Sequence, residues 1–215
     1  MTNWIFIVII ATGLPIGILA KVWVRQMIQQ RQPGIGLFPW LDDSWQIQVI
    51  WALAGALIQG IALIKASLSW TALIFAIWFY ALMMLSFVDV AIRKIPNEML
   101  ALMIVARLFD LIIHRNLAFF TQALLGLATG YFFFTLPVLF GRSIGKGDAK
   151  LAAVIGFSIG IVGMLQSVVI MSLGIVICYS LILKHKRSNL RTKVAMGPYL
   201  SFGMVVSVLW PIAIP

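Results

Sequence analysis

Long apolar segments follow one another along almost all of the 215 residues, and this succession restricts the folds that the chain can adopt. Of the residues, 62% are hydrophobic and only 10% are charged, whereas soluble domains are roughly half apolar and a quarter charged. A helix that crosses a bilayer needs roughly 20 mostly apolar residues. The sequence therefore predicts a polytopic membrane protein that forms one membrane domain over residues 1–215.

About eight apolar runs are predicted as membrane spans, and seven is the alternative count because the sixth and seventh runs adjoin each other. The runs are too long for barrel strands and do not alternate between polar and apolar residues, so we expect helices. The predicted fold class is an all-α transmembrane helix bundle. The runs cover residues 3–23, 47–64, 70–89, 98–113, 118–140, 149–163, 165–184 and 197–213.

Lysines and arginines are distributed unevenly between the two predicted sides of the bundle. Loops after even-numbered runs contain only Lys65 and Arg115, whereas loops after odd-numbered runs contain nearly all the other cations. Because cytoplasmic loops are rich in Lys and Arg, we expect the odd-numbered loops, including 24–46, to be cytoplasmic and both termini to lie outside. The formal charge of +10 thus indicates topology and argues against nucleic-acid binding. The cytoplasmic cations are Lys21, Arg25, Arg31, Arg93, Lys94, Arg142, Lys146, Lys150, Lys184, Lys186, Arg187, Arg191 and Lys193.

Two of the six acidic residues, Asp89 and Asp148, lie at the ends of predicted spans. Asp89 ends the third run, where the negative end of the helix dipole disfavours a carboxylate. An ionisable group at membrane depth costs about 3 kcal/mol and indicates a functional site, unless Arg93 or Lys94 pairs with it. Asp148 directly precedes the sixth run, where an aspartate also serves as a helix N-cap.

The other four acids have structural interpretations. Asp42 and Asp43 lie in the first cytoplasmic loop, where we expect them to be solvated. Asp110 follows Arg107 by three residues, a spacing that allows an ion pair on one helix face. Glu98 begins the fourth run, where an acid suits the positive end of the helix dipole and the preceding asparagine suits a cap.

Asp89 and Asp148 are predicted to act as a pair, because both lie at cytoplasmic ends of spans that a bundle can bring together. Two carboxylates at close range do not both ionise easily, so one keeps its proton and the pair offers an acid and a base at neutral pH. With a water molecule between them, such a pair can hydrolyse a peptide bond. The glycines before Asp148 allow a substrate backbone to approach closely.

The sequence does not fit a phosphate-binding loop, a dinucleotide-binding site or a metal site. The segment 141–150 lacks the spacing of a phosphate-binding P-loop and the third glycine of a dinucleotide fingerprint. Cys178 is the only cysteine, and His114 and His185 are predicted on opposite sides of the membrane. No metal site is therefore expected.

Three segments, taken together, resemble the type IV prepilin peptidases. Residues 145–151, GKGDAKL, resemble the GxGDxKL signature of that family, and FVDVAIRKIPNEM resembles its first aspartate segment. VAMGPYLSFG, residues 194–203, resembles its late G-P-[FY]-L-x-x-G element. The three segments occur in the family's order, each beside a predicted span.

The resemblance implies an integral-membrane aspartyl endopeptidase with a peptidase core over about 47–213. Such an enzyme cleaves the basic leader of type IV prepilins or pseudopilins after a glycine, at the cytoplasmic face of the bacterial inner membrane. Prepilins and membrane lipids are the implied partners, in pilus, secretion or competence systems, and proteolysis needs no cofactor. Asp89 and Asp148 are the implied catalytic pair. The implied supporting residues are Pro96, Asn97, Gly145, Lys146, Gly147 and Lys150, with Gly197 and Pro198 in the late element.

The N-terminal part differs from the longer members of the family. The loop 24–46 lacks their two cysteine pairs, and their first-span motif G-S-F-L-N-V is GILAKV here. Many of those members also methylate the new N-terminus with S-adenosylmethionine. The differences leave open whether this chain has that second activity and uses that cofactor.

Two alternatives remain. Presenilin-type proteases also use a GxGD aspartate, but they carry a late Pro-Ala-Leu element where this chain has Pro198-Tyr199-Leu200. An ion-coupled transporter with Asp89 and Asp148 as a proton relay is the alternative from another class. Transporters place such acids near mid-span, whereas both aspartates here lie at span ends.

Overall fold

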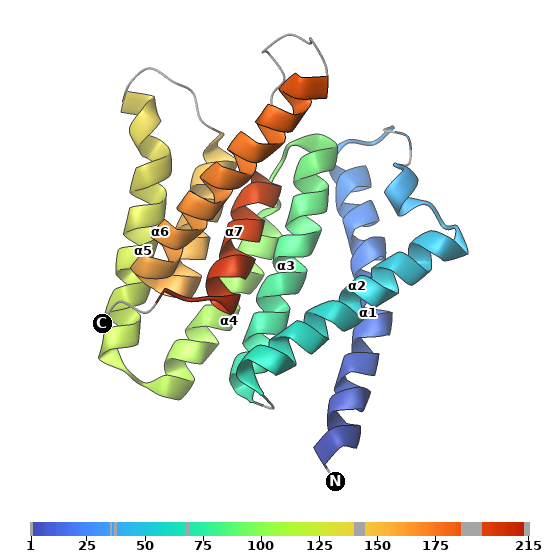
Figure 1. The fold of residues 1–215 in the computed structure, drawn as a ribbon, viewed down its shortest axis with the longest axis horizontal. Helices are drawn as coiled ribbons and strands as arrows, with labels where there is room; N and C mark the ends of the chain where they lie inside the picture. The colour runs from blue at the N-terminus through green and yellow to red at the C-terminus, as the bar shows by residue number, and fades with distance from the viewer. Residues whose placement is uncertain are drawn as a thin grey trace. The chain divides into compact units, whose positions relative to one another are not determined.

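The computed structural model describes residues 2–34, 36, 38–67, 69–139, 145–185 and 195–212. Over these residues the regular elements are all helical, which confirms the predicted all-α polytopic bundle (Figure 1). Among them, α1, α2, α3, α5 and α6 are long and apolar enough to cross a membrane. The elements are α1 (Thr2–Arg31), the 3₁₀ helix η1 (Pro39–Leu41), α2 (Trp45–Ala66), α3 (Trp70–Ile92), α4 (Asn97–His114), α5 (Leu117–Leu139), α6 (Lys146–His185) and α7 (Gly197–Leu209).

The chain forms two compact units, Met1–Asp110 and Leu111–Pro215, which divide within α4. In the first unit, α1 and α2 pack at glycines, whose small size lets helix backbones approach closely. A Cβ atom on Gly13 would lie 2.6 Å from the carbonyl oxygen of Gly55, so the two backbones are in direct contact. The hydroxyl of Tyr80 in α3 donates to that same Gly55 oxygen at 2.9 Å, which joins α3 to the α2 backbone.

Helix α1 continues beyond the predicted first span of 3–23 and ends at Arg31. Glutamine and arginine are good helix formers, so the polar residues after Val24 extend the helix instead of ending it. The following segment turns back through η1, where Leu41 is almost fully buried. The predicted loop 24–46 is therefore partly helical and is packed against its own unit.

The second unit is built on α6, which packs against α5 and α7. Gly126 of α5 lies against the backbone of Gly156, so neither position has room for a side chain. Gly203 of α7 lies in the same way against the backbone of Ser167. The hydroxyl groups of Ser167 and Ser207 are 3.0 Å apart in this second contact.

Helix α6 corresponds to two of the eight predicted runs, because its backbone leaves helical geometry at Gly160 (φ 75°, ψ 179°). Figure 1 shows the ribbon turning back there, so that both ends of α6 lie at the same end of its unit. A positive φ of this kind is readily adopted only by glycine. The conformation explains why the sixth and seventh runs adjoin with no polar loop between them.

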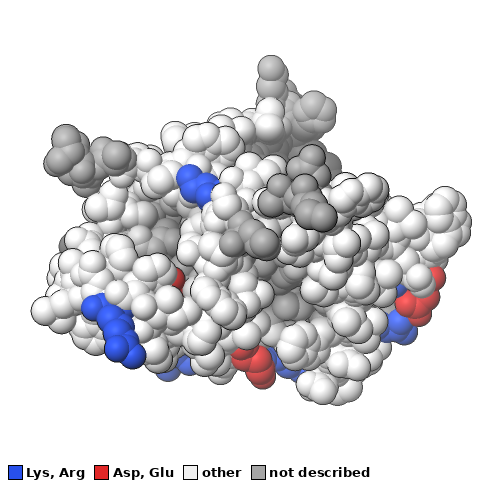
Figure 2. Space-filling model, turned by 90° about the horizontal axis from the view of Figure 1, so that it is seen from below, with Lys and Arg blue, Asp and Glu red and all other residues white. Residues whose placement is uncertain are grey.

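The surface is dominated by uncharged residues, as Figure 2 shows for one face, where lysines, arginines and acids form only isolated patches. Large apolar side chains are exposed along the spans; Trp4, Ile64 and Leu117 are more than 70% accessible. Such exposure suits a lipid environment. Of the cations predicted as cytoplasmic, Arg142, Lys186, Arg187, Arg191 and Lys193 lie outside the described residues.

Candidate active site

Asp89 lies in the last turn of α3 and is 5% exposed. Its backbone carbonyl accepts a hydrogen bond from the amide of Arg93 at 2.8 Å, and Arg93 adopts the left-handed conformation (φ 52°) that ends the helix. Arg93 and Lys94 are both exposed. The prediction that Asp89 lies at the C-terminal end of a helix is confirmed.

The segment after Asp89 returns the chain directly into α4. Pro96 is buried, and its carbonyl accepts a hydrogen bond from the amide of Leu100 at 3.5 Å. Asn97 is the first residue of the helix, so the expectation that Asn97 forms the cap is wrong, because Pro96 occupies that position. Glu98 lies in the first turn, as predicted, and accepts from Arg31 Nη2 at 2.5 Å.

Asp148 lies in the first turn of α6, as its third residue. The interpretation as an N-cap is corrected, because the capping position belongs to Gly145, whose carbonyl accepts from the amides of Asp148 (3.0 Å) and Ala149 (3.4 Å). A Cβ atom on Gly145 would lie 2.8 Å from Asp148 Oδ2. The carboxylate therefore bends back over Gly145, and a side chain at this position would require the Asp148 carboxylate to move.

The residues predicted to support this loop lie at the surface of the second unit. Lys146 and Lys150 are exposed, and Gly147 is half-buried. In the late element, Gly197 is buried and begins α7, and Pro198 follows in the first turn, where proline is favoured. The predicted site residues of this unit thus lie at or just before the N-terminal ends of α6 and α7.

Asp89 belongs to the unit Met1–Asp110, and Asp148 belongs to the unit Leu111–Pro215. Each unit therefore supplies one of the two predicted catalytic carboxylates. Their joint action stays a prediction.

The predicted ion pair between Arg107 and Asp110 is confirmed, with a separation of 2.5 Å between Arg107 Nη1 and Asp110 Oδ2. Both side chains are about one-tenth exposed. The pair neutralises two charges within α4, which leaves Asp110 with a structural role.

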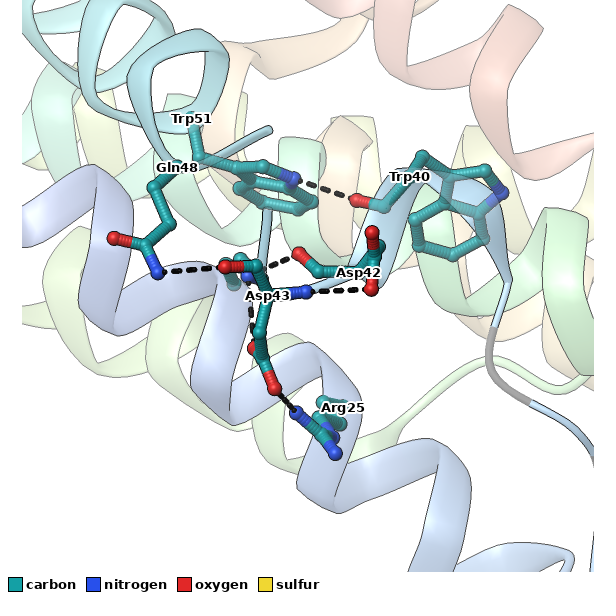
Figure 3. A network of polar contacts seen from close by, with 7 residues as sticks. Arg25, Trp40, Asp42, Asp43, Gln48 and Trp51 are labelled. Atoms are coloured by element: carbon teal, nitrogen blue, oxygen red, sulfur yellow. Dashed lines mark hydrogen bonds and ion pairs between the residues drawn. The ribbon is translucent and has the colours of Figure 1, made fainter. Parts of the chain in front are cut away.

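Asp43 lies in a polar network (Figure 3). This network was not predicted from the sequence, because Asp42 and Asp43 were expected to be solvated. Lys21 is 3% exposed, and its ammonium donates to the Asp42 carbonyl at 2.5 Å and to Asp43 Oδ1 at 3.1 Å. Arg25 Nη1 donates to Asp43 Oδ2 at 2.6 Å. The bond from Arg25, followed by that from Lys21, holds the pKa of Asp43 below its usual value of 3.8.

Aromatic side chains continue this network towards α3. Trp51 of α2 donates from Nε1 to the carbonyl of Trp40 at 2.9 Å, a bond drawn in Figure 3. The ring of Phe87 lies 5.0 Å from that of Trp40 and 4.6 Å from that of Trp51. Because Phe87 precedes Asp89 by two residues, the loop is anchored on the helix end that carries Asp89. Contacts between residues so far apart in the chain have no local sequence signal.

Among the residues that the structure describes, no group of three or more His, Cys, Asp and Glu side chains is placed to hold a metal ion.

Comparison with known proteins gives one match. The family model described as the type IV leader peptidase family matches residues 73–183, a range that contains both Asp89 and Asp148. No curated protein and no solved structure matches the chain. The matched range is more than half of the 215 residues, and the chain therefore belongs to the type IV leader peptidase family.

Proposed function

We propose that this protein is an aspartyl endopeptidase that removes the basic leader from type IV prepilins or pseudopilins at the cytoplasmic face of the bacterial inner membrane. The observation that carries the proposal is the burial of Asp89 in the last turn of α3, inside the range that the family model matches. A carboxylate at that position opposes the helix dipole and gains no stability from it. Catalysis gives a reason for a carboxylate there.

The opposite helix ends suggest different roles for the two aspartates. Asp148 lies at the N-terminal end of α6, where the dipole favours negative charge, and Asp89 lies at the C-terminal end of α3, where the dipole disfavours it. In the proposed pair, Asp148 is therefore the carboxylate and Asp89 keeps the shared proton. This division gives the base and the acid that hydrolysis needs.

In the proposed reaction, Asp148 takes a proton from a water molecule as the water oxygen attacks the scissile carbonyl carbon. Asp89 donates its proton to the carbonyl oxygen, which becomes the hydroxyl of a tetrahedral intermediate. The C–N bond then breaks: Asp148 gives its proton to the leaving nitrogen, and the hydroxyl that Asp89 protonated returns its proton to Asp89 as it becomes the carbonyl of the new carboxyl group. General acid–base catalysis of this kind contributes about 10²–10⁴-fold to a rate.

The location of the site follows from the charges in the loops. Asp89 precedes Arg93 and Lys94 by four and five residues, and Asp148 lies between Lys146 and Lys150. Cations at span ends favour the cytoplasmic side, so the proposed cleavage takes place at the inner face of the membrane. Methylation of the new N-terminus by S-adenosylmethionine is a separate proposal. The chain lacks the cysteine pairs and the G-S-F-L-N-V motif of the longer members, and this absence does not support methylation.

Coexpression with a prepilin tests the proposed function. We expect conversion of the precursor to a smaller product, and the mass of its N-terminal peptide will give the cleavage position and any added methyl group. A precursor that stays at full length in the presence of well-expressed protein would contradict the proposal. A matched precursor with its cleavage-site glycine replaced serves as the control that must remain intact.

A further inference from the structure

Trp40 lies in the 3₁₀ helix η1 and is half-buried in a cluster of aromatic side chains. The centre of its ring lies 5.0 Å from that of Phe87 on α3, and Phe87 in turn lies 4.6 Å from Trp51 on α2. Phe38 stacks on Trp40 at 5.2 Å. These four rings, which we call the aromatic cluster, join the segment before α2 to the end of α3.

The backbone around Trp40 is fixed by contacts with α1 and α2. The indole of Trp51 donates to the Trp40 carbonyl at 2.9 Å (Figure 3). The next residue, Leu41, is only 1% exposed, and Asp43 is bound by two cations of α1. The ring of Trp40 is therefore held in place by contacts that do not involve Phe87.

The end of α3 depends on contacts from outside the helix. Asp89 lies in its last turn, and last turns fray because their carbonyls lack partners within the helix. Arg93, which ends the helix, has a positive φ of 52°, a conformation that is uncommon for a residue with a side chain. Phe87 precedes Asp89 by two residues, or about 3 Å along the helix axis. A contact at Phe87 therefore restrains the turn that carries the Asp89 carboxyl group.

We propose that Trp40 is a positioning residue for the cleavage reaction. Through Phe87 it holds the last turn of α3, and with it the carboxyl group of Asp89, in the geometry for proton donation. This inference rests on the proposed function, in which Asp89 is the acid. Because a displacement of about 1 Å costs a reaction about a hundredfold in rate, a ring contact so close to Asp89 affects catalysis as well as stability.

An ion pair also reaches the segment after Asp89, but it is the weaker of the two contacts. Arg31 at the end of α1 pairs with Glu98 at the start of α4, and the Glu98 side chain is 61% exposed. Exposed ion pairs contribute little to stability. The aromatic cluster is therefore the contact through which the segment before α2 restrains Asp89.

Cleavage of a purified prepilin by the full-length protein tests the proposal in the wild type, Trp40→Ala and Trp40→Phe. We expect Trp40→Ala to lower kcat by at least about tenfold with KM changed by less than about twofold, because it displaces a reacting group and leaves precursor binding intact. Trp40→Phe keeps a ring against Phe87 and should recover most of the lost rate. In the double variant with Phe87→Ala, the losses in kcat should not be additive, because Trp40 acts through Phe87.

Phe75→Ala is the matched control on the same helix. Phe75 is half-buried like Phe87, and its ring lies 5.7 Å from that of Trp78 and 6.3 Å from that of Phe79. It precedes Asp89 by 14 residues, or about 21 Å along the helix axis. Its loss should lower stability and leave the kcat of the folded protein unchanged. Phe87→Leu replaces Trp40→Ala if that variant does not fold, and it should also lower kcat.

Hydrogen exchange at the amides of the last turn of α3 provides a readout that does not depend on cleavage. Exchange there should be faster in Trp40→Ala than in Phe75→Ala, since only Trp40 contacts this end of the helix. The proposal is overturned if Trp40→Ala keeps the wild-type kcat, or if Phe75→Ala loses as much of it. In both cases the wild type still cleaves the precursor, so the proposed function stands. A wild type that does not cleave the precursor overturns the proposed function, and this inference with it.

Discussion

Lys21, a buried residue of α1, donates a hydrogen bond of 3.1 Å to the carboxylate of Asp43, which lies 22 residues further along the chain. The carboxylate itself is largely exposed, with a side-chain accessibility of 67%. A buried ammonium group needs a partner, and the chain provides one by folding the segment after α1 back over its end. This contact holds the segment that precedes α2 against α1.

Asp43→Asn is expected to lower the melting temperature by about 2–4 °C, a typical shift for a modest loss of stability in a chain of this size. The substitution leaves Lys21 buried without its counter-charge. Thermal unfolding in detergent measures the shift. Lys21→Met in the same background should recover part of the loss, because the two side chains are coupled; fully additive losses would contradict a direct interaction.

Acidification should remove the stabilisation that the charge of Asp43 provides. Arg25 and Lys21 hold the pKa of Asp43 below 3.8 in the folded protein. The stabilisation is therefore fully present above that value and is lost as the pH falls through the lower folded pKa. Melting temperatures of the wild type and Asp43→Asn should differ constantly above about pH 5 and converge below pH 3.8. A difference that persists at the lowest pH would show that the charge of Asp43 is not the cause.

Helix packing at glycine gives a prediction with an internal control. Gly13→Ala places a Cβ atom 2.6 Å from the Gly55 oxygen and should destabilise the protein by about 1–3 kcal/mol through overpacking. Gly60→Ala lies in α2 with no atom near the added Cβ and should be neutral or stabilising by up to about 1 kcal/mol. Unfolding by denaturant in mixed micelles compares the two variants. Equal effects would contradict the close α1–α2 packing.

The turn within α6 makes a separate prediction. Gly160→Ala forces a side chain into a conformation that is essentially restricted to glycine (φ 75°, ψ 179°) and should cost about 1–3 kcal/mol. Gly174→Ala, in the second half of the same helix, meets its nearest neighbour at an ordinary 3.4 Å and should change stability by less than about 1 kcal/mol. The same unfolding assay measures both variants. A Gly160→Ala variant as stable as Gly174→Ala would contradict the turn.

The fold class and the local positions of the candidate catalytic residues were predictable from the sequence, because both depend on properties of short segments. Apolar runs determine the helices, and Asp89 and Asp148 lie where those runs end. The caps were assigned one to three residues away from their true positions, since Pro96 and Gly145 supply the capping carbonyls through the backbone rather than through a side chain.

Long-range contacts were not predictable in the same way. Arg31 and Glu98 are 67 residues apart in the chain, and nothing in either segment indicates that they meet. The burial of Lys21 was missed for the same reason, because a lysine at the end of an apolar run normally extends to the interface. Its true environment depends on a returning loop that brings Asp42 and Asp43 to it.

Cleavage of a purified prepilin by the reconstituted protein, compared among the wild type, Asp89→Asn and Asp148→Asn, tests the central claim most directly. Each substitution removes one member of the proposed acid–base pair and should reduce the cleavage rate by at least about a hundredfold. Glu98→Gln, an exposed acid paired with Arg31, is the matched control and should retain the wild-type rate. Cleavage at the wild-type rate by either aspartate variant would contradict a mechanism in which the two carboxyl groups act together.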